Sequence, residues 1–333
     1  MLSEYEALRA YAESRNVAVT GVEDLVRVAR AVTEGARRLR SFSQRERRVV
    51  ALLWHLGAVT AYLRRVEGRW TTWISPTPLA RRIAEGELAH LAVRVARWTP
   101  MRLLLRYMAQ KGGKATVDEV VSDLGKKVKE VTQRFLPVLK LAYRRLNGPV
   151  KKPYNRHVVT AVLFKLSKEL GLLAGEKRGE AEMTDLAYEL LEEPRIEVVK
   201  TMPREPLILL AVASVVTSSH RVYLVSPWID PEVAEALLPV LKGRKVTVVA
   251  RPTNKERYFK ALETLSSYCE VLTYPKLHTK LALGTSAILT SANLTRSSLL
   301  ANIETGVYYH RTPPQILAHT QEIVASATPL PLR

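Results

Sequence analysis

A histidine and a lysine stand two residues apart in a short apolar segment near the end of the chain. The segment 277–283 reads LHTKLAL, a pattern that predicts a β-strand. Because successive side chains of a strand point to opposite faces, His278 and Lys280 would share one face, with leucines on the other. An imidazole can act as a nucleophile or a base, and an ammonium can balance negative charge on an oxyanion.

Two further polar groups follow across a predicted turn. Residues 284–285 read GT and suit a two-residue hairpin turn, so 286–293 would return as a second strand. In that register His278 lies directly opposite Ser291, and Asn293 follows on the same face. We therefore expect an imidazole, an ammonium, a hydroxyl and an amide to meet on one patch, where they would hold a phosphodiester and attack it.

A third predicted strand adds a carboxylate to this patch. The segment 302–309 reads NIETGVYY, which places Asn302 and Glu304 on one face of the strand. We expect Glu304 to orient the imidazole of His278 by accepting the proton on its second nitrogen.

Taken in order, the three motifs resemble those of the phospholipase D superfamily. That family carries His-x-Lys, then Gly-Ser-x-Asn, and often Asn-x-Glu, and this chain has HTK at 278–280, TSAN at 290–293 and NIE at 302–304. Upstream, VYLVSPWID from Val222 resembles the family's first core strand and the loop that follows it. The similarity covers about the last 130 residues.

The resemblance implies a phosphodiesterase that works through a covalent intermediate. His278 would attack phosphorus to give a phosphohistidine, and Lys280, Ser291 and Asn293 would stabilise the phosphoryl oxygens. A second histidine would protonate the leaving oxygen, and neither a metal ion nor a cofactor is implied. Since the chain carries the motif once, the resemblance implies a homodimer in which two copies of His278 meet at a two-fold axis.

One departure from the family pattern leaves an alternative function open. Thr285 stands where the family has an aspartate, in a turn that is two residues shorter than the usual one. The alternative is a catalytically inactive, DNA-binding transcription regulator that keeps the phospholipase-D fold. Such regulators are expected to lack the paired histidine and lysine, which this chain has.

Charge and composition favour nucleic acid over a membrane as the partner. The formal net charge is +19, and the residues before Ile196 hold 36 basic and 22 acidic side chains. Such an excess attracts polyanions, so we expect DNA or RNA as the partner, and no membrane. The lone Cys269 excludes an internal disulfide and indicates a cytoplasmic protein, and the apolar stretch 207–216 is too short to span a membrane.

The arrangement of predicted elements indicates a multidomain protein. A chain of 333 residues exceeds the usual size of one hydrophobic core. We expect a mainly helical basic domain at 1–98, a winged-helix-like domain at 99–195, and an α/β phospholipase-D-like catalytic domain at 196–333. In the last domain, predicted strands at 222–225, 245–250 and 271–274 alternate with predicted helices at 231–241 and 254–268. This alternation predicts parallel strands within a mixed sheet that is flanked by helices.

The first domain contains a predicted helix and a predicted hairpin. The sequence SQRE at 43–46 has the form of a capping box that opens a helix. Residues 60–74 alternate around a Glu-Gly turn and predict a hairpin. The hairpin interleaves Arg64, Arg65 and Arg69 with Tyr62, Trp70 and Trp73. These side chains would grip phosphates and stack on bases, or the tryptophans would fill a local core.

The second domain has the spacing of a winged helix. Helices are predicted at 101–110, at 116–125 and at 126–136, and their spacing is that of a helix-turn-helix. The sequence TVDE at 116–119 has the form of a capping box that opens the second of them. A further helix is predicted at 158–170, with wing strands at 172–174 and 181–183. The pattern LGLLAGEKRGEAEMTDLAYELLEEP resembles the end of archaeal winged-helix domains. The predicted nucleic-acid contacts are Lys126, Lys127, Lys129 and Arg134, together with Lys177 and Arg178 at the wing tip. Either the helix at 126–136 or the one after Asn155 would be the recognition helix, and a role in protein contacts stays open.

Overall fold

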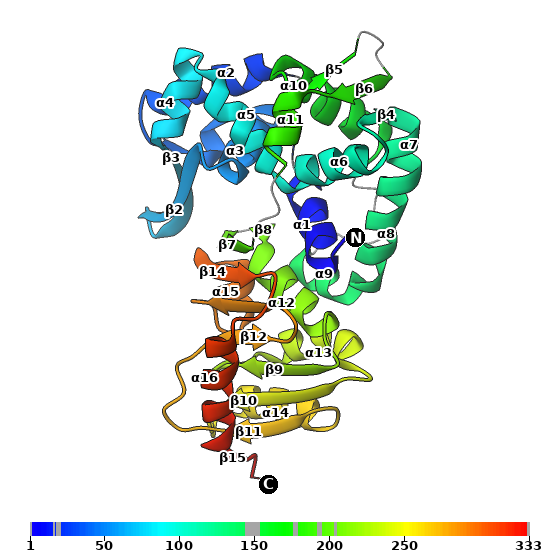
Figure 1. Ribbon diagram of the computed structural model, residues 1–333. Helices are drawn as coiled ribbons and strands as arrows, with labels where there is room; N and C mark the ends of the chain where they lie inside the picture. The colour runs from blue at the N-terminus through cyan, green and yellow to red at the C-terminus, as the bar shows by residue number, and fades with distance from the viewer. Residues whose placement is uncertain are drawn as a thin grey trace. The chain divides into compact units, whose positions relative to one another are not determined.

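The structure is a computed structural model that describes residues 2–15, 17, 21–143, 154–175, 179–191, 195–202 and 205–331 (Figure 1). The chain divides into two compact units. Unit 1 comprises Met1–Leu2, Arg9–Val131 and Lys151–Glu193, and unit 2 comprises Ser3–Leu8, Thr132–Val150 and Pro194–Arg333. The division into three domains stays a prediction. Among the described residues, no helix combines the length and the apolar character that crossing a membrane requires.

The first part of unit 1 consists of short helices and one hairpin. Its elements are α1 (Glu4–Arg15, which begins in unit 2), α2 (Val22–Thr33), β1 (Arg37–Arg38), η1 (Leu39–Ser41), α3 (Gln44–His55), β2 (Val59–Val66), β3 (Arg69–Pro76), α4 (Pro78–Glu85) and α5 (Leu88–Arg97). The predicted capping box is confirmed at α3. The Ser43 hydroxyl accepts from the Glu46 amide at 3.2 Å, and the Glu46 carboxylate accepts from the Ser43 amide at 2.9 Å.

The predicted hairpin is also confirmed, with β1 added at its edge to give the strand order β1-β3-β2. Val66 pairs with Arg69, so Glu67 and Gly68 form a two-residue turn. Both have positive φ, 49° and 75°, as a type I′ turn requires. Trp70 is 70% exposed, so the expectation that the tryptophans fill a local core is wrong for this residue.

The second part of unit 1 combines helices with a small antiparallel sheet of order β4-β6-β5. Its elements are α6 (Thr99–Gln110), β4 (Lys114–Thr116), α7 (Val117–Glu119), η2 (Val120–Leu124), α8 (Gly125–Arg134, whose end lies in unit 2), η3 (Val158–Phe164), α10 (Lys165–Glu169), β5 (Leu173–Ala174), β6 (Glu180–Met183) and α11 (Asp185–Glu189). The capping box that opens the helix after Thr116 is confirmed. The winged helix itself stays a prediction.

The expected break at Gly125 is wrong. Gly125 has helical angles, φ −61° and ψ −38°, and the chain stays helical from α7 through η2 to the end of α8. A Cβ at this position would lie 2.9 Å from the carbonyl oxygen of Tyr154. Gly125 therefore does not end the helix. Its missing side chain lets the backbone at Tyr154 approach the helix closely. The predicted helix-turn-helix within 116–136 does not form, and the helix after Asn155 directly precedes the β5–β6 pair.

Unit 2 is built on a nine-stranded mixed sheet of order β15-β11-β10-β9-β12-β13-β14-β7-β8. The strands are β7 (Ile196–Met202), β8 (Glu205–Pro206), β9 (Arg221–Val225), β10 (Lys245–Ala250), β11 (Glu270–Thr273), β12 (Leu281–Leu283), β13 (Ala287–Thr290), β14 (Glu304–Tyr309) and β15 (Thr328–Pro329). As predicted, β9, β10 and β11 are parallel. The remaining pairs are antiparallel, which confirms a mixed sheet.

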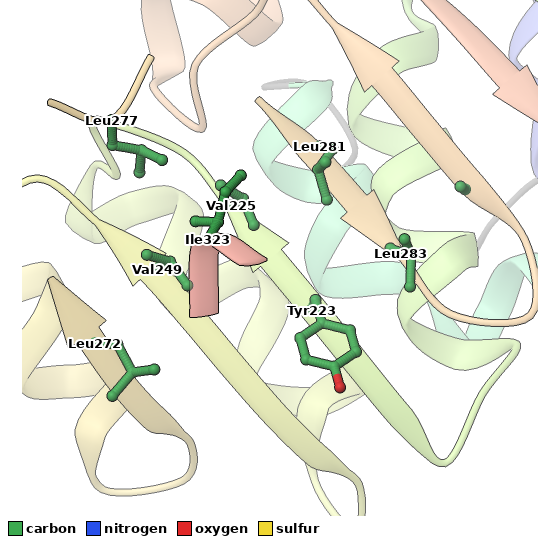
Figure 2. Close-up of a cluster of buried hydrophobic side chains, with 9 residues drawn as sticks. Tyr223, Val225, Val249, Leu272, Leu277, Leu281, Leu283 and Ile323 are labelled. Carbon is green, nitrogen blue, oxygen red and sulfur yellow. The ribbon is translucent and has the colours of Figure 1, made fainter. Parts of the chain in front are cut away.

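Helices flank this sheet, as expected for an α/β unit. They are α9 (Leu136–Ala142), α12 (Leu207–Thr217), α13 (Pro231–Leu241), α14 (Glu256–Ser266), α15 (Arg296–Leu300) and α16 (Pro314–Ala325). The apolar stretch of α12 is buried over its whole length, from Leu207 to Val216. On another face, Ile323 of α16 belongs to a cluster of buried apolar side chains that includes Val225, Leu281 and Leu283 of the central strands (Figure 2). Because Leu281 and Leu283 are buried in this cluster, they fix which face of β12 points inward. The candidate site residues His278 and Lys280 directly precede this strand.

Candidate active site

The strand that was predicted to carry His278 and Lys280 is shorter than expected. Only Leu281–Leu283 forms a strand, and residues 277–280 approach it without regular structure. Leu281 pairs with Leu289, and the Thr290 amide donates to the Lys280 carbonyl at 3.1 Å. Lys280 therefore lies across from Thr290, and the predicted register, with His278 opposite Ser291, is wrong by one residue.

The turn between β12 and β13 explains the shift. Gly284 closes the hairpin by donating from its amide to the Ser286 carbonyl at 2.8 Å, so the turn has three residues instead of two. The Thr285 hydroxyl donates to the Ser218 carbonyl at 2.8 Å, at the end of α12. A Cβ on Gly284 would lie 2.8 Å from the Ser219 Cβ, so the turn packs closely on that helix end. Packing, rather than local turn chemistry, sets the register here.

Ser291 still reaches the site, because the chain leaves β13 after Thr290. Its amide donates to the Thr305 carbonyl at 2.9 Å, and its hydroxyl accepts from the Thr305 amide at 3.1 Å. The same hydroxyl donates to the Glu304 carboxylate, which also accepts from the Asn302 side-chain amide at 3.4 Å. Residues of the second and third motifs are thus joined by hydrogen bonds at neighbouring strand ends.

Lys280 is the cation of this group. Its ammonium donates to the backbone carbonyl of His278 at 2.8 Å. Partial burial lowers the pKa of Lys280, and Arg251 lowers it further, while the carboxylate of Glu304 acts in the opposite direction. The charge of Lys280 thus interacts with one carboxylate, that of Glu304, and one guanidinium, that of Arg251. Its hydrogen bond to the His278 carbonyl also holds the segment before β12.

His278 is exposed, and its ring makes no hydrogen bond or ion pair within the described part of the chain. The partners of Glu304 are Ser291 and Asn302, so the expected hydrogen bond from the His278 imidazole to Glu304 does not form. The exposed ring is free to meet a ligand from solvent.

Asn293 lies two residues beyond Ser291 and holds a buried acceptor. Its Oδ1 is buried and has no hydrogen-bond partner among the residues that the structure describes. Leaving a buried acceptor without a hydrogen bond costs roughly 1–3 kcal/mol of folding free energy. Such an acceptor is expected where a ligand or a water molecule donates a hydrogen bond to it. The neighbouring Leu294 amide donates to the Ser226 hydroxyl at 3.0 Å, which ties this segment to the loop after β9.

That loop is held by a buried carboxylate. Asp230 is 5% exposed and accepts from the Arg296 amide at 2.7 Å and from Arg257 Nε at 3.2 Å. Its own amide donates to the Leu294 carbonyl at 3.0 Å. These contacts fix the segment after β13 against the end of β9.

Arg251 is a site residue that the sequence reasoning missed. Its Nε donates to the Leu277 carbonyl at 2.5 Å, and its guanidinium lies over the ring of Trp228, 5.8 Å from the centroid. Trp228 in turn packs on Tyr258, with ring centroids 5.2 Å apart. A signal was present, because Arg251 directly follows the predicted strand 245–250, and ligands of parallel sheets gather beyond such strand ends.

The predicted nucleic-acid contacts are carried by other elements of the chain. Arg64, Arg65 and Arg69 are exposed on the β2–β3 hairpin, and Lys126 and Lys127 are exposed on α8. Lys129 is half-buried, and Arg134 pairs with Glu4 at 2.9 Å. Lys177 and Arg178 lie outside the described residues. Within the described residues, no three His, Cys, Asp or Glu side chains gather closely enough to hold a metal ion.

No protein-family model matches the chain, and no curated protein does. Solved structures resemble parts of it. NucT from Helicobacter pylori is 18% identical over 40% of this chain and 99% of its own, with a TM-score of 0.36. Nuc from Salmonella typhimurium, a phospholipase D family member, is 19% identical over 42% of this chain and 100% of its own, with a TM-score of 0.36. TrmBL2, an archaeal chromatin protein, is 12% identical over 92% of this chain and 94% of its own, with a TM-score of 0.31. At these TM-scores, none of the likenesses places a catalytic group in this chain.

Proposed function

We propose that unit 2 is a phospholipase-D-type phosphodiesterase that cleaves DNA, with His278 as the nucleophile. The observation that carries this proposal is the arrangement of Lys280, Ser291 and Glu304 at adjacent strand ends. Ser291 is hydrogen-bonded to Glu304, and Lys280 is hydrogen-bonded to the backbone of the exposed His278. A nucleophile, a cation and hydrogen-bonding groups on one edge of a rigid sheet suit attack on a phosphodiester.

The reaction would proceed in two displacements at phosphorus. An imidazole nitrogen of His278 attacks, the bond to the leaving oxygen breaks, and a second histidine gives that oxygen a proton. Water then attacks the phosphorus of the phosphohistidine and passes a proton to the second histidine, and the P–N bond to His278 breaks to release the cleaved strand. Lys280 and Arg251 stabilise the charge on the phosphoryl oxygens, so we expect the chain's own cations to sustain cleavage in EDTA.

The second histidine would come from another copy of the chain. The His-x-Lys motif occurs once in the sequence, and a two-fold axis through the site would present His278 twice. In this arrangement one copy supplies the nucleophile and its partner supplies the acid. We propose a homodimer on this ground.

DNA is the proposed substrate because of charge. The basic excess lies mostly before Ile196, and α8 exposes Lys126 and Lys127. The order of helices and strands from α6 to β6 favours a winged-helix-like DNA-binding part, with the helix at 158–169 as its recognition helix. We propose a cytoplasmic protein without a membrane partner, since a single cysteine in the chain fits a reducing compartment.

Cleavage of supercoiled plasmid in EDTA tests the proposal. The wild-type protein should nick the plasmid, and His278→Ala should abolish nicking while it still binds the same DNA. His319→Ala is the matched control, because His319 is also exposed in unit 2 and lies 3.6 Å from Glu322 on α16. Nicking by His278→Ala at the wild-type rate would contradict the proposal.

A DNA-binding regulator without catalysis is the second candidate. It is favoured by Thr285 in the place of the family's aspartate and by the absence of a hydrogen bond from the His278 ring within the described residues. This candidate predicts duplex binding with no nicking by wild-type protein under any condition in which the protein binds.

A further inference from the structure

The β2–β3 hairpin of unit 1 carries aromatic and cationic side chains on both of its faces. Tyr62, Arg64, Arg69 and Trp73 share one face, because Tyr62 pairs with Trp73 and Val66 with Arg69. Arg65 and Trp70 pair with each other on the other face. The hairpin extends beyond the helices of its unit (Figure 1). The side chains nearest the turn, Arg64, Arg65, Arg69 and Trp70, are exposed.

The arginines of the hairpin are not neutralised by carboxylates. Within the described residues, Arg38, Arg64 and Arg69 form no ion pair, whereas the neighbouring Arg37 pairs with Glu34. Arg64 and Arg38 instead lie over the ring of Trp73, 5.3 and 5.7 Å from its centroid. Surface arginines that stack on a ring keep their outward N–H groups available for phosphate.

The exposure of Trp70 has no structural explanation within the unit. Its side chain is 70% exposed, more than any other large hydrophobic side chain of the described chain. Ile74 on the same face is fully buried and anchors the base of β3, so the strand is held without any contribution from Trp70. An aromatic face in solvent beside unpaired cations is the combination that stacks on bases and grips their phosphates.

We propose that the β2–β3 hairpin is a binding site for single-stranded nucleic acid, with Trp70 as a base-stacking platform. In a duplex the faces of the bases are covered by their neighbours, and only unpaired bases can stack on Trp70. A protein partner would be expected to cover the arginines with carboxylates, whereas a phosphate backbone suits arginines on both faces. The strand bound here would be a substrate of unit 2, and in this respect alone the inference rests on the proposed function.

The test measures the affinity of the full-length protein for a fluorescent 20-nucleotide oligo-dT and for a 20-base-pair duplex. The His278→Ala variant serves as the parent, so that substrate survives the titration. Trp70→Ala should weaken oligo-dT binding about tenfold and leave duplex affinity within about twofold, and Trp70→Phe should recover most of the loss. Oligo-dT should also quench tryptophan emission in the parent and much less in Trp70→Phe.

The arginines are tested by salt dependence. Arg64→Ala and Arg69→Ala together should lower the slope of log affinity for oligo-dT against log salt by about 1.4, since each phosphate contact contributes about 0.7 for a single strand. Arg37→Ala removes the same charge from a paired arginine and should leave the slope unchanged. Tyr268→Ala, which truncates a 50% exposed ring in unit 2, is the control for Trp70.

Two results would overturn the inference. One is unchanged oligo-dT affinity in both Trp70→Ala and the double arginine variant. The other is an equal loss for oligo-dT and duplex, which would indicate general electrostatic attraction. Because binding is measured without cleavage, failure of the nuclease proposal would show instead as absent nicking by wild-type protein with these affinities intact.

Discussion

The two hairpins that the sequence predicts differ in what fixes them. At β2–β3 a Cβ on Gly68 would meet nothing within 4 Å, and the turn follows its own Glu-Gly chemistry. At β12–β13 the turn packs on the end of α12, and Gly284 is required by that contact. Register is therefore set by local sequence where a turn contacts nothing else, and by packing where the turn lies against a helix end.

The same contrast extends to the side chains that the hairpins carry. Around β12–β13, Lys280 is held by the His278 carbonyl and Ser291 by the Glu304 carboxylate, both through hydrogen bonds, so the groups are preorganised. On β2–β3, Trp70 and the arginines are open to solvent and can adapt to a ligand. Preorganisation suits catalysis, and adaptable exposed groups suit binding of a flexible strand.

The largest effect should come from removing the cation of the preorganised site. Lys280→Ala should lower kcat for nicking by about 10²–10³, because a group that stabilises transition-state charge is lost. Arg64→Ala on the exposed hairpin removes an equal charge and should change affinity while kcat stays near the wild-type value. Steady-state kinetics on a short labelled substrate would measure both. An equal fall in kcat for the two variants would contradict the assignment of catalysis to the β12–β13 region and of binding to the β2–β3 hairpin.

A pair of glycine substitutions compares the two turns directly. Gly284→Asn should destabilise the protein by about 1–3 kcal/mol, because its Cβ meets the Ser219 Cβ at 2.8 Å and the Val215 carbonyl oxygen at 3.1 Å. Gly68→Asn should cost less than about 1 kcal/mol, since asparagine tolerates the positive φ of 75° and the position is open. Denaturant unfolding monitored by circular dichroism would give both values. Similar losses would mean that packing does not set the β12–β13 turn.

The smallest expected effect is a shift in pH dependence. Protonated Lys280 is the active form, so activity should be lost as pH rises through its pKa. Glu304 raises that pKa and Arg251 lowers it. Glu304→Gln should therefore move the alkaline limb of the kcat profile to lower pH, and Arg251→Ala should move it to higher pH. Shifts in the same direction would show that Lys280 does not govern this limb.

Much of unit 2 could be predicted from the sequence because its elements have strong local signals. The helix Pro231–Leu241 and the strand Lys245–Ala250 have the predicted bounds, since proline opens the helix and an apolar run forms the buried strand. In unit 1, the capping boxes at Ser43 and Thr116 mark helix starts that the structure reproduces. These signals lie within a few residues of one another.

The failures involve residues that are distant in sequence. Gly125 was expected to end a helix, but the backbone of Tyr154 explains the glycine. The site register depends on Ser218 and Ser219, at the end of a helix far upstream of β12. Arg251 joins the site through the Leu277 carbonyl, which only the folded sheet brings near. Long-range packing of this kind leaves no short-range pattern to find.

The most direct test of the catalytic claim is to trap the covalent intermediate. Wild-type protein mixed with labelled oligonucleotide in EDTA should be quenched in alkali, where phosphohistidine survives, and digested for mass spectrometry. The account predicts a nucleotide attached to the peptide that contains His278, with no adduct in His278→Ala. Turnover without any adduct, or an adduct on another residue, would contradict it.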